Sequence, residues 1–119
     1  MVRKQKYSQG DIVFIDLDPA KGTEQKKKRP CLIISNDNYN KVFNTIIVIP
    51  ISSSQKYLED EKYRVSPLFV EITCNDVHGT VLLQHVRAID PNLRISSKIK
   101  GHISDDKLYQ IINVIKQFF

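Results

Sequence analysis

The chain has 119 residues, of which 41% are hydrophobic and 26% are charged, and it carries a formal net charge of +5. This size and composition are typical of one globular domain spanning residues 1–119. No apolar run approaches the roughly 18 residues of a membrane span, and the start lacks the apolar segment of a signal peptide, so we expect a cytoplasmic protein with no membrane partner.

The positive charge is concentrated near the start of the chain. Residues 1–30 hold eight Lys and Arg against four Asp and Glu, whereas residues 31–119 hold ten against nine. Such a local excess is typical of a phosphate-binding face, because each neutralised phosphate releases condensed counterions. The alternative interpretation of the charge alone is a solvated surface that keeps the protein soluble.

Runs of apolar and β-branched residues, separated by turn residues, predict the strands. They cover residues 12–17, 29–35, 45–51, 68–73 and 80–89, with one more short strand within 94–103. Pro50 indicates an edge position or a strand end for the third run, because proline cannot donate to a ladder. Residues 52–67 are polar and predict a long, mobile loop.

A helix is predicted at the end of the chain, over residues 104–119. Ser104 is a suitable N-cap, and Asp105 and Asp106 suit the first turn. Apolar residues recur on one face and predict core contacts: Leu108, Ile111, Ile112, Ile115, Phe118 and Phe119. Strands first and one helix last indicate a mainly β (α+β) fold, a small curled antiparallel sheet or partly open barrel packed on the helix. A homodimer is expected, because sheet edges need to be covered.

The chemistry-bearing residues are few. The sequence has no phosphate-binding glycine loop, no metal-ligand cluster and no GxSxG motif, so we expect neither a metal nor another cofactor. Cys31 and Cys74 match no CxxC spacing and are expected to be reduced thiols. Arg29 begins one predicted strand and Ser52 follows another, so antiparallel pairing would bring both to the same end of the sheet.

These two residues suit metal-free cleavage of RNA. That reaction needs a base for the 2′-hydroxyl, a stabiliser for the phosphorane and an acid for the 5′-oxygen. Arg29 is the candidate stabiliser, because a guanidinium holds two phosphate oxygens at once, and Ser52 is a candidate donor to the same phosphate. Glu24 or a histidine is the candidate base, and the residues do not decide between them.

The loop that precedes the second predicted strand carries a resemblance. The segment GDIVFIDLDPAKGTEQKKKRPCLIIS, followed by TIIVIPIS and VLLQHVRAID, resembles the MazF/PemK family of toxins from bacterial toxin–antitoxin modules. The resemblance covers about residues 9–115. Its most specific part is G-[ST]-E-Q-x-x-x-R-P, which is carried here by Gly22, Thr23, Glu24, Gln25, Arg29 and Pro30.

The resemblance implies a fold, an activity and partners. The expected fold is an SH3-like barrel of the CcdB/PemK type with a C-terminal helix, and the expected assembly is a homodimer. Members cut single-stranded RNA at short sequences without metal and leave a 2′,3′-cyclic phosphate and a 5′-hydroxyl; the family's catalytic Arg falls on Arg29, and its catalytic Thr or Ser falls on Ser52. The expected inhibitor is an acidic antitoxin that folds on binding, with DNA contacted only through the antitoxin complex.

Further residues are candidates for binding RNA. They are Gln25, Lys26, Lys27, Lys28, Ser53, His85 and Arg87. The three lysines depart from the small or mixed residues usual in the family and should strengthen attraction to the RNA backbone. On a strand, His85 and Arg87 would share one face, and the role of His85 stays open between base contact, acid–base chemistry and structure.

Two other functions remain open from the sequence. One is a non-enzymatic poison of DNA gyrase, since gyrase-directed toxins share this barrel, although they lack the Glu-Gln-x-x-x-Arg-Pro loop. The other is an inactive RNA-binding barrel, because binding and cleavage use the same cations. The cleavage sequence is not indicated by any motif.

Overall fold

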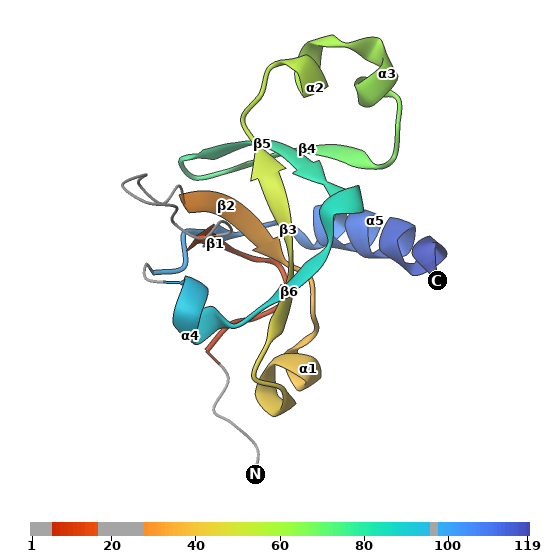
Figure 1. Cartoon of the computed structure of the whole chain (residues 1–119). Helices are drawn as coiled ribbons and strands as arrows, with labels where there is room; N and C mark the ends of the chain where they lie inside the picture. Colours follow the sequence, from red (N-terminus) through yellow and green to blue (C-terminus); the bar gives the residue numbers. More distant parts are fainter. Residues whose placement is uncertain (1–5, 17–27, 96–97) are drawn as a thin grey trace, which may run out of the picture.

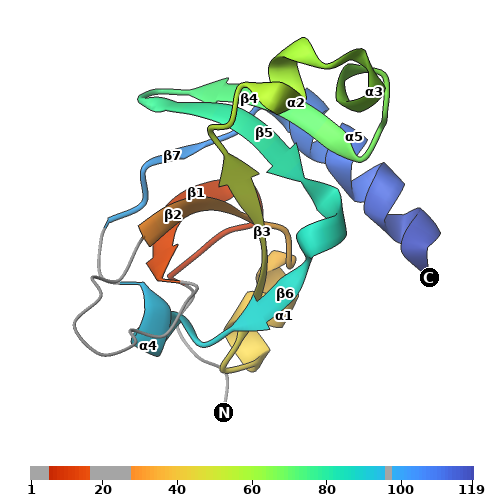
Figure 2. The ribbon, with the colours of Figure 1, turned by 45° about the horizontal axis from the view of Figure 1, so that its top comes forward.

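The computed structural model of the protein describes residues 6–16, 28–95 and 98–119. Within these ranges an antiparallel sheet of seven strands has the order β4-β5-β3-β2-β1-β7, and β6 pairs with the first half of β3. The strands are β1 (Asp11–Asp16), β2 (Lys28–Ile33), β3 (Ile46–Ser52), β4 (Phe69–Cys74), β5 (Val77–Leu82), β6 (Arg87–Ile89) and β7 (Gly101–His102). The sheet curls into a nearly closed barrel (Figures 1 and 2), which confirms the expected fold class.

Short helices connect the strands, and a longer one ends the chain. They are α1 (Asp37–Val42), α2 (Lys56–Glu59), α3 (Glu61–Arg64), α4 (Pro91–Arg94) and α5 (Asp105–Ile115), with 3-10 turns η1 (Leu83–His85) and η2 (Lys116–Phe118). The predicted cap of α5 is confirmed, because the Ser104 side chain accepts a hydrogen bond from the Lys107 backbone N–H at 3.3 Å. No helix of the described residues is long and apolar enough to cross a membrane.

Both faces of the sheet carry buried apolar side chains. One cluster of these side chains packs against α5, and a second cluster lies on the opposite face of the sheet. Ile12, Leu32 and Ile49 are paired across β1, β2 and β3 and form the first cluster with Ile111 of α5. Their neighbours along the strands point the other way, and Val13, Cys31 and Val48 form the second cluster. This double burial explains why the runs in β2 and β3 are almost uniformly apolar.

The position of Pro50 differs from the prediction. β3 is a central strand and pairs with β2 on one side and with β6 and β5 on the other. β6 pairs with β3 over Ile46–Val48, whereas β5 pairs with Ile51 and Ser52. Pro50 lies between these two ladders, where a missing N–H donor costs no hydrogen bond, so it is tolerated in the middle of the sheet.

Three further predictions about elements need correction. The run 80–89 is two strands, because η1 interrupts it after Leu82. Residues 52–67 contain α2 and α3, so they form a helical excursion instead of a plain loop. In the last predicted core positions, Phe118 is 41% exposed and Phe119 fully exposed, because the chain turns into η2 beyond the sheet.

Candidate active site

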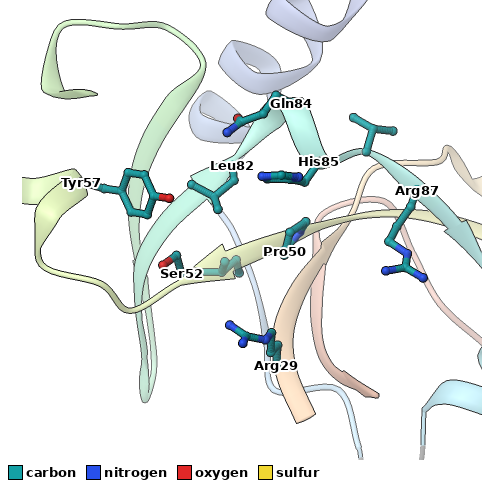
Figure 3. Close-up of a pocket in the computed structure, with 10 residues that line it drawn as sticks. Arg29, Pro50, Ser52, Tyr57, Leu82, Gln84, His85 and Arg87 are labelled. Atoms are coloured by element: carbon teal, nitrogen blue, oxygen red, sulfur yellow. The ribbon is translucent and has the colours of Figure 1, made fainter. Parts of the chain in front are cut away.

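A groove of about 660 Å³ opens beside the last residues of β3 (Figure 3). Residues from β2, β3, α2, β5, η1 and β6 line it, so that its shape depends on the whole curled half of the barrel. The lining residues are Arg29, Pro50, Ile51, Ser52, Tyr57, Leu82, Gln84, His85, Val86 and Arg87. Among these described residues none is acidic, and two are arginines, so the groove is suited to an anionic ligand.

The antiparallel pairing of β2 and β3 brings Arg29 and Ser52 together, as the sequence predicts. The β2–β3 pairing ends where Cys31 lies opposite Pro50, and Arg29 and Ser52 lie two residues beyond this last pair on β2 and β3. Side chains two residues apart on a strand lie on the same face of the sheet, and both Arg29 and Ser52 line the groove, so the guanidinium and the hydroxyl share one wall of it. Figure 3 shows Arg29 beside Ser52 and Pro50.

The Ser52 side chain is held by its own turn and by its neighbour strand. Its hydroxyl oxygen accepts a hydrogen bond from the Ser54 backbone N–H at 3.2 Å, which leaves the hydroxyl proton available for donation. On β5, a Cβ at Gly79 would collide with the Ser52 carbonyl oxygen and with Ile51. A residue without a side chain is therefore required beside Ser52.

Arg87 stands at the other end of the groove from Tyr57 (Figure 3) and lies opposite Val48 in the β3–β6 pairing. Cys31, which lies opposite the groove residue Pro50, is fully buried. Burial raises the pKa of the Cys31 thiol to about 12, although the positive charges of Arg87 and Arg29 act to lower it. The Arg29 and Arg87 guanidinium groups are therefore both close enough to act electrostatically on one buried sulfur atom.

His85 lines the groove, but it does so from η1 and not from a strand. The expectation that His85 and Arg87 share a strand face is wrong, because η1 ends at His85 and β6 begins at Arg87. The turn places the imidazole over Pro50 (Figure 3). Imidazole can accept or donate a proton near neutral pH, which makes His85 the described lining residue best suited to acid–base chemistry.

Among the lining residues whose side chains carry a polar group, Tyr57 and Gln84 were not predicted. Tyr57 is held in an aromatic cluster, with its ring centroid 5.3 Å from that of Phe69 and 4.9 Å from that of Tyr63. The signal for Tyr57 was an aromatic residue in a mostly polar segment, three residues after the serine cluster. Gln84 sits in the same turn as His85 and gave no signal of its own.

The other predicted site residues either do not line the groove or lie outside the residues that the structure describes. Glu24, Gln25, Lys26 and Lys27 fall outside the residues that the structure describes. Lys28 is the exposed first residue of β2, directly before Arg29, and the exposed Ser53 is not among the described residues that line the groove. Within the described ranges, no group of three His, Cys, Asp or Glu side chains could hold a metal ion.

The fold and the groove define a small curled β-barrel with a site suited to phosphate-bearing ligands. The chain belongs to the PemK-like, MazF-like toxins of type II toxin–antitoxin systems, since the model of that family matches residues 8–119. It is similar to the endoribonuclease toxin ChpB of Escherichia coli K12, with 36% identity over 100 residues and 83% of each chain covered. It is also similar to the endoribonuclease MazF of Staphylococcus saprophyticus, with 32% identity over 114 residues, or 89% of this chain and 85% of that one.

Solved structures show the same fold. The crystal structure of MazF from Deinococcus radiodurans superposes with a TM-score of 0.71 over 94% of both chains, at 24% identity. A MazE–MazF structure from the same organism gives a TM-score of 0.73 over 94% of both chains, at 23% identity. The MazF-type barrel with a terminal helix that the sequence resemblance implied is thereby confirmed.

Proposed function

We propose that this chain is a sequence-specific endoribonuclease toxin that cuts single-stranded RNA without a metal ion and leaves a 2′,3′-cyclic phosphate and a 5′-hydroxyl. Its family and the names of two of its relatives support an endoribonuclease. The observation that carries the proposal is the wall of the groove on which Arg29 and Ser52 stand side by side. Cutting messenger RNA in this way would inhibit translation and growth.

In the proposed reaction the 2′-oxygen of a ribose attacks the adjacent phosphorus, and the bond from phosphorus to the 5′-oxygen breaks. The Arg29 guanidinium binds two non-bridging oxygens and neutralises the charge that they gain in the phosphorane. Ser52 donates its hydroxyl proton in a hydrogen bond to one of them. A base takes the proton of the 2′-hydroxyl, and the leaving 5′-oxygen takes up a proton from the protonated base or from water, so that the products are the cyclic phosphate and the free hydroxyl.

The proton acceptor for the 2′-hydroxyl is proposed to be Glu24 or His85. Glu24 is in the family motif, whereas His85 is inside the groove and faces Pro50 (Figure 3). The pH–rate profiles of Glu24→Gln and His85→Gln separate the two roles. The variant that removes the base should lose the limb of the profile on which activity rises with pH, because that limb reports deprotonation of the base.

The remaining cations are proposed to bind the RNA backbone. Arg87 marks one end of the groove, and Lys28 precedes Arg29 on β2. Together with Gln25, Lys26 and Lys27, these residues would attract phosphates on either side of the cut. An extended strand of RNA would then run along the groove from Tyr57 towards Arg87.

The proposed partners are a cognate antitoxin and a second copy of the chain. An acidic segment that folds into the groove would compete directly with RNA for Arg29 and Arg87. The solved neighbours include MazE–MazF structures and a mycobacterial endoribonuclease in complex with its cognate antitoxin. Light scattering on the purified protein tests the homodimer, and a mass of one chain would refute it.

The test of the activity is a comparison of cleavage rates on a long single-stranded RNA. Arg29→Ala should lower the rate at least about 100-fold, as removal of a donor to a developing oxyanion does. Arg29→Lys should restore only part of it, since an ammonium cannot bind two oxygens in one plane. Lys107→Ala is the matched control, because Lys107 is exposed on α5, which packs on the other face of the sheet. Full activity in a folded Arg29→Ala protein would refute the proposal.

A further inference from the structure

A smaller cavity, of about 150 Å³, adjoins the groove at Tyr57. It is lined by Tyr57, Leu58, Arg64, Phe69, Glu71 and Thr80. Tyr57 lines both this cavity and the groove, so the two share one wall. Figures 1 and 2 show α2 and α3 standing over β4 and β5, the elements that contribute all six residues.

The strand register ties this cavity to Ser52. Thr80 lies directly opposite Ser52 in the β3–β5 pairing and directly opposite Glu71 in the β4–β5 pairing. The three side chains therefore form one polar row across three strands, on the same face of the sheet. Neighbouring strands are about 4.8 Å apart, so Glu71 lies about 10 Å from Ser52. A nucleotide whose phosphate contacts Ser52 could reach this row with its own or the adjacent base.

The Thr80 hydroxyl, a buried polar group that lacks a hydrogen-bond partner among the described residues, indicates that the cavity binds a ligand. Thr80 is only 2% exposed, and its hydroxyl has no hydrogen-bond partner among the residues that the structure describes. Burying a hydroxyl without a partner is costly, and valine would fill the same volume without that cost. A ligand that enters the cavity and bonds this hydroxyl would satisfy it.

The charges of the lining residues define what kind of ligand fits. Glu71 repels a phosphate and accepts hydrogen bonds, Arg64 offsets its charge and only donates them, and Thr80 can donate or accept one. Tyr57 and Phe69 supply aromatic surface against which a flat ring can pack, as single-stranded RNA readers commonly do. These properties fit an uncharged, flat group that carries hydrogen-bond donors on its edge, which describes a nucleobase with an exocyclic amino group.

We propose that this cavity is a base-binding subsite that selects an amino-bearing base next to the cut, through Glu71 and Thr80. This inference rests on the proposed function, because it takes RNA as the ligand of the groove. Cytosine and uracil present the same ring, but cytosine offers an amino group where uracil offers a carbonyl oxygen. The subsite should therefore favour cytosine over uracil.

The test measures binding without cleavage. Short single-stranded oligonucleotides made only of cytosine or only of uracil, with 2′-deoxy sugars that cannot be cut, are titrated into the protein and followed by fluorescence anisotropy. The wild-type protein should bind the cytosine oligonucleotide at least about fivefold more tightly, as one good base-edge contact implies. Glu71→Ala and Thr80→Val should each bring this ratio close to one.

Matched controls make the result specific. Glu59→Ala removes an equal charge from an exposed position of α2 that does not line the cavity, and it should leave the cytosine-to-uracil ratio unchanged. Thermal unfolding followed by circular dichroism checks that each variant is folded, and Thr80→Val is expected to be at least as stable as the wild type. A wild-type ratio near one, or an unchanged ratio in both variants, would overturn the subsite.

The same proteins separate failure of the subsite from failure of the proposed function. Fragment ends are mapped on an RNA pool of random sequence. If the wild-type protein cuts RNA but has the same cytosine-to-uracil affinity ratio as Glu71→Ala and Thr80→Val, the proposed nuclease activity is supported and the proposed subsite is refuted. If the wild-type protein binds the cytosine oligonucleotide more tightly than the uracil one but cuts no RNA, the subsite is supported and the proposed nuclease activity is refuted.

Discussion

The pKa of Cys31 is set by two opposing effects, its burial and the positive charges of Arg29 and Arg87. Its thiol is fully buried under Arg29 and Arg87, and burial raises its pKa to about 12. The thiolate, which is the reactive form, is therefore absent from the folded protein at pH 8. We expect iodoacetamide to modify the half-buried Cys74 first and Cys31 only after unfolding, as peptide mass spectrometry would show. Modification of Cys31 as fast as Cys74 in native buffer would contradict this.

The raised pKa of Cys31 also has a consequence for stability. Between an unfolded value near 8.5 and a folded value of about 12, the folded state binds the proton that the unfolded state releases. The contribution of Cys31 to stability is therefore intact below about pH 8.5 and falls as pH rises, by up to about 1.4 kcal/mol per pH unit. Urea unfolding at pH 8 and pH 10 should show a smaller loss in Cys31→Ala than in the wild type. Equal losses would contradict the assigned cause.

Gly79 tests how tightly Ser52 must be held. A Cβ at position 79 would collide with the Ser52 carbonyl oxygen and with Ile51, so Gly79→Ala must push β3 and β5 apart. We expect a loss of about 1–3 kcal/mol in the free energy of unfolding, measured with urea, and a lower cleavage rate, although position 79 does not line the groove. Lys107→Ala, at an exposed position of α5, is the control. Wild-type stability and rate in Gly79→Ala would show that β3 adjusts freely.

At the scale of elements, α5 is the main cover of one sheet face. Ile111 is fully buried in the cluster that α5 shares with the sheet, whereas Tyr109 of the same helix is 71% exposed. Ile111→Ala should lower the free energy of unfolding by about 2–5 kcal/mol. Tyr109→Ala should change it little. Loss of the cap in Ser104→Ala should cost about 1 kcal/mol. Equal losses in the free energy of unfolding for Ile111→Ala and Tyr109→Ala would contradict this packing.

The elements also show what the sequence could and could not predict. The strands that contain Ile12 and Leu32 were evident because β-branched, apolar runs ended at turn residues. The meeting of Arg29 and Ser52 followed from antiparallel pairing alone. The break at η1 could not be predicted, because the residues from Val81 to Val86 contain no Gly or Pro to mark it. The place of Tyr57 depends on how α2 folds back over Phe69, a long-range packing that no local pattern encodes.

At the scale of the whole molecule, the excess positive charge should govern affinity for RNA. Log affinity for a single strand falls with log salt by about 0.7 for each phosphate contacted. Four contacts would weaken binding about 50-fold between about 50 and 200 mM salt. Binding of an uncleavable oligonucleotide at several salt concentrations measures this slope. A slope near zero would contradict an electrostatic groove, and Arg87→Ala should reduce it by about one contact.

The central claim is that RNA bound in the groove is cut by attack of the RNA's own 2′-hydroxyl on the adjacent phosphorus, and that Arg29 stabilises the phosphorane without a metal ion. The most direct measurement incubates the protein with a defined single-stranded RNA in excess EDTA and determines the chemistry of the new ends. The account predicts discrete cuts that carry a 2′,3′-cyclic phosphate and a 5′-hydroxyl, and none with Arg29→Ala. Intact RNA, or ends that carry a 5′-phosphate, would contradict it.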